Sequence, residues 1–186
     1  YNSAIMYSGF GWGADGEDSG LWMVCSNYEI IDSRFYDCWA GIFALSSNGI
    51  ISNVTLENCG YGIFIGGSSN IIIKQSKIYS ANYGVYLRST SGVQLESYDI
   101  RNSIFGVYIK ECNNIRISGG SHSNNTYGIL MWDSSNASIL FTTVTGGFFG
   151  IVLHRSSNID ILFSYIESNN MTCILSHLSE NLTVMC

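Results

Sequence analysis

In the second half of this chain, side chains that can move protons recur at one constant interval, which is the spacing from Glu111 to Asp133. At that interval the sequence places Glu111, Asp133, Arg155 and His177, and Lys110, Trp132 and His154 stand one position before the first three. If the chain winds with that period, the carboxylates lie roughly 5 Å apart, and the group could cleave a glycoside by acid–base or nucleophilic chemistry. The alternative is a ladder of opposite charges on a solvated turn, which contributes little to stability.

A glycine marks the period that would bring these residues together. A triplet of an aromatic residue, a glycine and a β-branched residue returns at the same interval. The triplets begin at Tyr61, Tyr83, Phe105, Tyr127 and Phe149. Gly20 and Gly41 extend the pattern toward the N-terminus, and Thr172 takes the glycine position in the last repeat. A fixed period of this length predicts a solenoid, in which each repeat buries its apolar face against its neighbours.

Apolar residues alternate with period two inside each repeat, as at Val107 and Ile109. This alternation predicts strands and not helices. Each repeat is therefore expected to form one coil of a parallel β-solenoid, an all-β fold of about eight coils with no capping helix. We expect a single domain over residues 1–186, with an irregular segment and a partial strand at 1–19 and repeats over 20–186.

Residues one period apart lie above one another in such a stack, so the sequence divides into columns. Two inward columns are expected to end at Cys173 and Leu175, and a third holds His122 as a core histidine that is hydrogen-bonded to a turn. One outward column is apolar where alternation would give polar residues. It comprises Trp22, Phe43, Phe64, Tyr86, Tyr108, Leu130, Val152 and Ile174. With the glycine column beside it as a trough, this stripe should be covered by a neighbouring copy, the N-terminal segment or carbohydrate.

Composition narrows the classes of function. Apolar residues make up 46% of the chain, which is enough for a core, and charged residues only 12%. The net charge of −6 argues against nucleic acid as a partner, and no apolar run is long enough to insert in a membrane. Asp15, Glu17 and Asp18 lack the spacing of a calcium loop and are interpreted as a solvated acidic turn. No histidine or cysteine spacing matches a metal site, so we expect neither a metal nor a cofactor.

Six cysteines indicate an extracellular protein at the cell surface. Sequons, which favour the same location, begin at Asn53, Asn124, Asn136, Asn170 and Asn181. Cys38 and Cys59 fall in one column of adjacent coils, within the Cα separation of about 4.4–6.8 Å that a disulfide needs, so we predict an intrachain bond. Cys173 is expected to be a buried apolar residue. Turns or edges remain for Cys25, Cys112 and Cys186, which are candidates for intermolecular bridges.

The repeats resemble those of the NosD and pectate-lyase-like superfamily of parallel β-helices, in which Gly-Ile-x-Leu and Ser-Ser-Asn recur in the same way. The resemblance covers residues 20–186 and implies the fold, but such helices host lyases, hydrolases, phage spikes and surface proteins. Lyases with this fold concentrate many aspartates and basic residues, which this chain does not. We therefore favour the charge ladder for Glu111 and Asp133, and predict a protein that is not an enzyme and has no catalytic residues.

The ends of the repeat array favour self-association. The sequence predicts no capping helix, and the last repeat, 173–186, stops within a coil, so both tips should be open sheet edges that add a further copy head to tail. These features resemble the hoop-forming sheath protein of filamentous methanogenic archaea. That resemblance implies a structural, self-assembling extracellular protein that is cross-linked by disulfides, contacts itself laterally through the outward stripe and has itself as partner. The alternative is a carbohydrate-active or carbohydrate-binding β-helix protein that uses the same stripe. A third is a fragment of a larger adhesin, phage spike or NosD-like protein.

Overall fold

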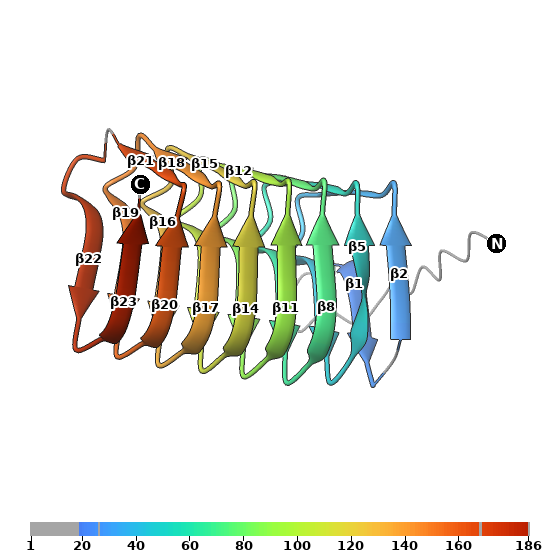
Figure 1. Ribbon diagram of the computed structural model, residues 1–186. Helices are drawn as coiled ribbons and strands as arrows, with labels where there is room; N and C mark the ends of the chain where they lie inside the picture. The colour runs from blue at the N-terminus through green and yellow to red at the C-terminus, as the bar shows by residue number, and fades with distance from the viewer. Residues whose placement is uncertain (1–18, 26, 168, 186) are drawn as a thin grey trace.

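The computed structural model describes residues 19–25, 27–167 and 169–185, and they form a stack of β-coils (Figure 1). Each complete coil gives one strand to each of three parallel sheets, which have eight, eight and seven strands. Neighbouring strands of a sheet come from successive coils, and no helix occurs within the ranges given above. The predicted all-β parallel solenoid is confirmed, with seven complete coils and an eighth that contributes strands to two sheets.

We name the three sheets A, B and C, in the order in which the chain passes through them in each coil. Sheet A contains β1 (Ser19–Val24), β4 (Ala40–Leu45), β7 (Tyr61–Gly66), β10 (Tyr83–Arg88), β13 (Phe105–Lys110), β16 (Tyr127–Trp132), β19 (Phe149–His154) and β22 (Thr172–His177). Sheet B contains β2 (Asn27–Ile31), β5 (Asn48–Ser52), β8 (Ser69–Lys74), β11 (Ser91–Glu96), β14 (Asn113–Ser118), β17 (Ser135–Leu140), β20 (Ser157–Leu162) and β23 (Glu180–Met185). Sheet C contains the short strands β3 (Arg34–Tyr36), β6 (Thr55–Glu57), β9 (Lys77–Tyr79), β12 (Asp99–Arg101), β15 (Ser121–Ser123), β18 (Thr143–Thr145) and β21 (Tyr165–Glu167).

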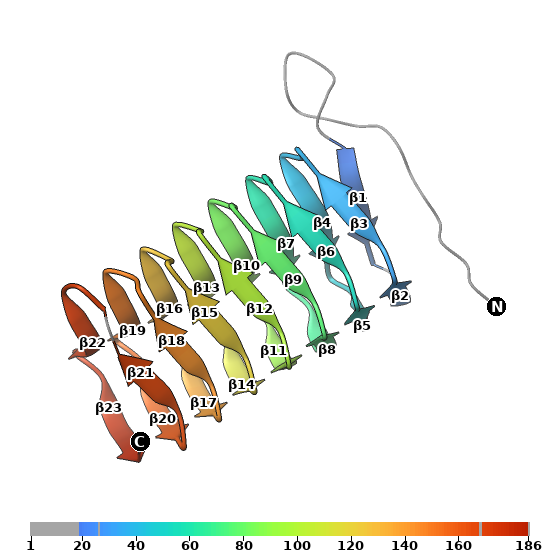
Figure 2. The same ribbon diagram turned by 90° about the horizontal axis from the view of Figure 1, so that it is seen from above.

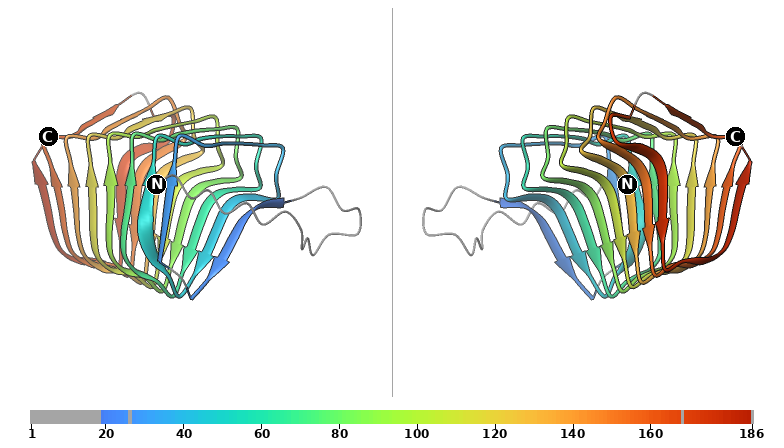
Figure 3. Two further views of the ribbon diagram at one scale, coloured as in Figure 1. Left: turned by 90° about the vertical axis from the view of Figure 1, so that its right-hand side faces the viewer. Right: turned by 90° about the vertical axis from the view of Figure 1, so that its left-hand side faces the viewer.

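The core is a continuous column of aliphatic side chains between the three sheets. Seen along the stack, the coils lie one behind another and the sheets enclose the interior (Figure 3), while the view from above separates the row of sheet A from that of sheet B (Figure 2). Ile100, Ile109 and Ile117 come from sheets C, A and B and are each fully buried. Burying a side chain of this size contributes about 1.5–3 kcal/mol, so the repeated inward columns account for much of the stability.

The turns between sheets use the left-handed backbone conformation at a fixed position. In the turn from sheet A to sheet B, φ is 51° at Ser89, 56° at Glu111, 50° at Asp133 and 46° at Arg155. The amide of each such residue donates to a carbonyl of the next coil, for example from Glu111 to Trp132 at 3.0 Å. Side chains other than glycine, asparagine and aspartate rarely adopt this conformation. Here the continued sheet ladder fixes it in coil after coil.

The last coil departs from the period of the coils before it. The amides of Met171 and Thr172 both donate to the carbonyl of Phe148, at 2.9 and 3.3 Å, so two residues oppose one in a β-bulge. After this bulge each strand residue pairs one position further along the chain, so Ile174 pairs with Ile151 and Leu175 pairs with Val152. The prediction that Ile174 lies in the outward stripe is therefore wrong.

The same shift corrects two further predictions. Leu175 lies in the outward stripe and is 41% exposed, although an inward position was predicted. Cys173 is exposed as well and not buried in the core. His177 pairs with His154, so it does not share a column with Arg155. One inserted residue thus changes the side that every later side chain of β22 faces.

His122 lies in the core, as predicted. It is 1% exposed, and its Nε2 atom lies 2.7 Å from the hydroxyl of Tyr98, which stands in the turn between β11 and β12. Burial lowers the pKa of His122 to about 3, an effect only partly opposed by the backbone of Gly128. The Nδ1 atom has no hydrogen bond of normal geometry to any residue in the described ranges. The imidazole is therefore neutral.

Some predictions concern residues that the structure does not describe. Asp15, Glu17, Asp18 and Cys186 lie outside the described ranges. A cap on the first coil would also involve residues that are not described, so the predicted open N-terminal tip stays untested. None of the described residues forms a helix that is long and apolar enough to cross a membrane.

Candidate functional site

The outer face of sheet A carries three columns of side chains that run along the stack. We name them the ring column, the outer column and the edge column, in order from the corner with sheet C to the corner with sheet B. The ring column comprises Tyr61, Tyr83, Phe105, Tyr127 and Phe149. The outer column comprises Trp22, Phe43, Phe64, Tyr86, Tyr108, Leu130, Val152 and Leu175. The edge column comprises Arg88, Lys110, Trp132, His154 and His177.

Aromatic rings in the first two columns form one continuous surface. Successive ring-column centroids lie 4.9–5.1 Å apart with interplanar angles of 9–12°. In the outer column, Tyr86 and Tyr108 stack at 4.9 Å. The columns also touch each other, with 5.3 Å between Tyr83 and Tyr86 and 5.5 Å between Phe105 and Tyr108. These separations lie in the range of favourable ring contacts, so the rings support one another as a rigid sheet of aromatic groups.

The ring column stands where a glycine trough was predicted. A Cβ added to Gly62 would lie 2.8 Å from Cγ2 of Ile78, a core residue, and 2.5 Å from the carbonyl of Gly84. The glycines therefore face inward at a corner where the chain bends, and the aromatic residue before each glycine faces outward. The predicted trough is wrong. The sequence signal for the ring column is the aromatic residue that precedes each of these glycines.

The outer column is less exposed than the sequence predicted. Leu130 is 8% exposed and Val152 is 9% exposed, whereas Trp22 at the first coil is 44% exposed. Burial raises the pKa of Tyr86 and Tyr108, and neighbouring tyrosines raise it further. The ring column thus covers part of the stripe, and a lateral contact with another molecule through this stripe stays a prediction.

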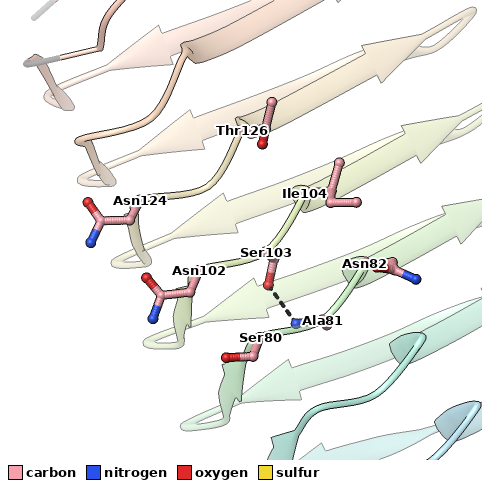
Figure 4. A pocket seen from close by; sticks show the side chains of 8 residues that line it. All are labelled: Ser80, Ala81, Asn82, Asn102, Ser103, Ile104, Asn124 and Thr126. Carbon is pink, nitrogen blue, oxygen red and sulfur yellow. Dashed lines mark hydrogen bonds between the residues drawn. The ribbon is translucent and has the colours of Figure 1, made fainter.

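A polar groove of about 380 Å³ lies beside the ring column, at the corner where sheet C passes into sheet A (Figure 4). It is lined by Ser80, Ala81, Asn82, Asn102, Ser103, Ile104, Asn124 and Thr126. Asn82, Ile104 and Thr126 each stand one residue before a member of the ring column, so the groove and the rings share an edge. The amides of Asn82, Asn102 and Asn124 make no hydrogen bond to another described residue, and Figure 4 shows the last two pointing to the same side. These amides are available to a ligand.

At the opposite border of the face, the structure brings most of the predicted proton-transfer residues together. Glu111, Asp133 and Arg155 occupy one turn position in three successive coils. The Arg155 guanidinium contacts both carboxylate oxygens of Asp133 at 2.7 Å, and Lys110 Nζ lies 3.8 Å from Oε1 of Glu111. Leu178 takes the turn position that was predicted for His177. Because all these turns share one backbone conformation, that conformation is not itself a sign of catalysis.

Two imidazoles meet in the edge column. The Nδ1 atoms of His154 and His177 are 3.0 Å apart, and His154 also packs on Trp132 with centroids 4.1 Å apart. The Arg155 guanidinium lies 5.9 Å from the centre of the Trp132 ring. One imidazole must donate and the other accept in such a contact. The edge column therefore holds groups that give and take protons beside the aromatic surface.

Cys38 and Cys59 lie in adjacent coils, as predicted. The amide of Gly60 donates to the carbonyl of Cys38 at 2.9 Å, and the two cysteine side chains contact each other. Burial raises the pKa of the Cys59 thiol to about 11, with smaller effects from Cys38 and the carbonyl of Glu57. The disulfide between the two stays a prediction.

Among the other cysteines, Cys112 differs from its prediction. It is 3% exposed, and its thiol donates to the carbonyl of Lys110 at 3.1 Å. It fills the inward turn position that Ser134 fills in the next coil, so the expected exposure at a turn or edge is wrong. Cys25 is exposed, and its part in an intermolecular bridge stays a prediction.

Comparison with known proteins supports the fold. The family of right-handed beta helix regions matches residues 19–102 and 61–185. No curated protein sequence matches the chain. Among solved structures, a candidate glycosyl hydrolase from Parabacteroides merdae is 11% identical with a TM-score of 0.58, over 76% of this chain and 78% of that one. The periplasmic alginate epimerase AlgG is 18% identical with a TM-score of 0.56, over 86% of this chain and 51% of that one.

A third structure is the endo-xylogalacturonan hydrolase of Aspergillus tubingensis, 13% identical with a TM-score of 0.56, over 89% of this chain and 61% of that one. This chain therefore spans about half to two thirds of the epimerase and of this hydrolase. Identities this low show the fold alone, and the named activities belong to those proteins.

These comparisons correct one prediction and leave another without support. The prediction that this chain is not an enzyme is overturned, because the solved structures that share its fold include hydrolases and an epimerase that act on carbohydrates. The resemblance to the methanogen sheath protein is not confirmed, and the alternative of a carbohydrate-active protein agrees better with the similar structures. The family match extends over nearly all of the described residues, so the chain belongs to the family of right-handed beta helix regions.

Proposed function

We propose that this chain is a carbohydrate-active β-helix protein that binds a polysaccharide on the outer face of sheet A, outside the cell or in the periplasm. One observation carries the proposal: a groove with free amides adjoins a double column of aromatic rings. Rings offer rigid contact area for the apolar faces of a sugar, and amides can both donate to and accept from its hydroxyls. The periplasmic epimerase and the hydrolases with this fold support the same ligand class and location.

The geometry of the rings suggests where a sugar packs best. Near-parallel rings only 4.9 Å apart must overlap along the stack, so most of them present edges and hydroxyls to solvent. The outer column changes from rings to aliphatic side chains after Tyr108, where Leu130 follows. Burial and the neighbouring Tyr83 raise the pKa of Tyr108, and Glu111 and Asp133 raise it further, so this ring lies within electrostatic range of the turn carboxylates. We expect a sugar unit at this step of the surface.

Local charge favours an anionic polysaccharide. Arg88 in the edge column is exposed and has no ion pair with any residue that the structure describes. Lys110 and Arg155 add two cations, and the carboxylates of Glu111 and Asp133 offset them. Arginine binds carboxylate and sulfate-like groups strongly because its donors form a planar fork. The border thus carries a cationic site at Arg88, although the whole chain has a net charge of −6.

The proposal includes modification of the bound polysaccharide at the same border. Acid–base chemistry on a sugar needs one group that gives a proton and one that takes it, both within reach of the reacting bond. The guanidinium of Arg155 forms an ion pair with Asp133 and lies over the ring of Trp132. Trp132 in turn packs on His154. The carboxylates lie within electrostatic range of Tyr108, where we expect the sugar unit, and His154 stands two coils further along the same border. Cleavage and epimerisation are the two reaction classes to test.

Binding is tested by titrating the purified protein with polyuronates and with a neutral glucan in a calorimeter. We expect a polyuronate to bind, and Asn102→Ala and Tyr86→Ala each to weaken it by about tenfold, which is about 1.4 kcal/mol. Arg116→Ala, on the outer face of sheet B, is the matched control and should bind as the unchanged protein does. Equal affinity in all variants, or no binding of any polysaccharide, would overturn the proposal.

Activity is tested on whichever polysaccharide binds. New reducing ends indicate cleavage, and changed anomeric proton signals without shortening indicate epimerisation. Asp133→Asn should abolish either product while keeping binding within a few-fold. A polymer that stays chemically unchanged after long incubation would contradict the activity and leave the binding proposal standing.

A further inference from the structure

The contact between His154 and His177 arises from the β-bulge in the last coil. Strict repetition of the earlier period would have set His177 beside Arg155, but the extra residue at the bulge moves it under His154 instead. Neither imidazole is needed to fill the core, since both stand on the outer face of sheet A and His177 is exposed. The sequence alone offers no reason to expect a metal site, because this pairing depends on the bulge.

The two rings face each other through their nitrogens. Their centroids are 5.0 Å apart and their planes differ by 16°, yet their Nδ1 atoms are only 3.0 Å apart. Rings lying flat over one another would keep their nitrogens as far apart as their centroids. The nitrogens must therefore lie between the ring centres, each directed toward the other ring. Two Nδ1 atoms from adjacent strands thus converge on one small region, and the proton that one of them holds in this contact can move to Nε2 of its ring when a cation binds.

We propose that His154 and His177 bind a divalent transition-metal ion of the zinc, nickel or copper class, each through Nδ1. Ligands that each lie about 2.0–2.1 Å from one ion stand roughly 2.9–3.4 Å apart for bond angles between a right angle and the tetrahedral angle. The 3.0 Å separation falls in that range. Imidazole nitrogen suits these metals, whereas calcium and magnesium prefer oxygen ligands.

The surroundings accept a cation and leave part of its coordination sphere open. The guanidinium of Arg155, the residue after His154, is held by both oxygens of Asp133 at 2.7 Å, which offsets its repulsion. No group of three or more His, Cys, Asp or Glu side chains in the described ranges could hold a metal ion, so among those residues the two imidazoles are the ligands that we propose. Water would complete the sphere, or oxygens of a ligand on the same face. Binding of the metal itself does not rest on the proposed function.

The test uses nickel chloride alone, titrated into the full chain in the Cys25→Ser, Cys173→Ser background, which removes the exposed thiols of the described residues. We expect one ion per chain by calorimetry and quenching of Trp132 fluorescence, since Trp132 packs on His154. His154→Gln and His177→Gln should each weaken binding by at least tenfold. Trp132→Phe should lose the quenching and keep the calorimetric binding, which ties the optical signal to this place.

Matched controls separate this site from general metal binding. Leu178→Ala removes an exposed side chain next to His177 that cannot bind a metal, and it should leave the affinity unchanged. Circular dichroism of each glutamine variant checks that the β-fold is kept. No detectable nickel binding by the parent chain, or equal binding by both glutamine variants and the parent, would overturn the proposal. Because no polysaccharide is present, these results stay distinct from a failure of the proposed carbohydrate function.

Discussion

Sheets A and B are built alike on the inside and differently on the outside. Each has eight strands in matching coils, and each sends aliphatic side chains such as Ile109 and Ile117 into the core. Along sheet B, the outward column opposite these residues reads Glu29, Ile50, Ile72, Gln94, Arg116, Ser138, Asp160 and Thr183. Along sheet A, the corresponding outer column begins with five aromatic residues.

This difference shows which residues the fold requires. Sheet B has ordinary alternation, with apolar side chains inside and mainly polar side chains outside, and it stacks as well as sheet A. The aromatic rings of sheet A are therefore not needed to form the solenoid. We therefore assign these rings to the ligand surface proposed above.

The largest effects should come from the interior, and they should be equal in the two sheets. Ile109→Ala and Ile117→Ala each leave a cavity in a fully buried column, so we expect a loss of about 2–5 kcal/mol in the free energy of unfolding for both. Urea denaturation measures this. Gln94→Ala, which faces outward on sheet B, is the control and should stay within about 0.5 kcal/mol of the unchanged protein. A loss confined to one of the two isoleucine variants would show that the sheets are not equivalent inside.

Acid should destabilise the interior of the solenoid through His122. Burial lowers the pKa of His122 to about 3, while an unfolded histidine titrates near 6.5. Between these values the unfolded chain binds more protons, so stability is complete above about pH 6.5 and falls with pH below it, by up to about 1.4 kcal/mol per pH unit. Denaturation at about pH 7 and about pH 5 should therefore differ by roughly 2 kcal/mol.

Two variants separate this effect from other acid sensitivity. His122→Ile, which matches its column neighbour Ile100, should remove most of the slope between the two pH values, whatever it does to stability at neutral pH. His154→Gln changes a histidine on the outer face of sheet A and should keep the slope. If His122→Ile and the unchanged protein lose the same stability on acidification, the protonation of this residue is not what destabilises the fold.

The outer faces themselves should differ in binding more than in stability. Tyr108→Ala removes stacking with Tyr86 and Phe105, so we expect a loss of about 1 kcal/mol in stability together with the loss of polyuronate binding. Tyr108→Phe keeps the ring and should restore most of both. Arg116→Ala on sheet B should change neither property. Calorimetry and urea denaturation measure the two effects, and an alanine variant that binds normally would remove this ring from the ligand surface.

How far the sequence predicts this molecule depends on which features are local. The inward columns could be predicted because period-two alternation and a glycine at a constant interval are both visible in the chain. The position of His177 could not, since one extra residue before Thr172 can be absorbed at several places and only the backbone shows where. Simple alternation would place Gly62 outward, yet the chain bends there and its hydrogen faces Ile78.

The candidate site was only partly predictable for a similar reason. Glu111, Asp133 and Arg155 obey the period, so their common turn position follows from the sequence. The groove could not be predicted in this way, because it depends on amides such as those of Asn82 and Asn102 that make no hydrogen bond to another described residue. Asn158 and Asn181 are the same residue type, yet their side chains are hydrogen-bonded to each other at 2.9 Å. Which amides are satisfied is a property of the folded stack.

The smallest effect on stability should come from the ion pair at the border of sheet A. Asp133→Asn leaves Arg155 without its carboxylate, but both side chains are partly exposed, so the loss in stability should be at most about 1 kcal/mol. Binding should respond differently, because the released guanidinium adds an unpaired cation to the border of sheet A that also carries Arg88, three coils away, and polyuronate affinity should become more sensitive to salt. Asp99→Asn, which frees Arg101 from an equally short pair on sheet C, is the matched control and should leave the salt dependence unchanged. If both variants shift it alike, the polysaccharide responds to total charge, and the border of sheet A has no special part in binding.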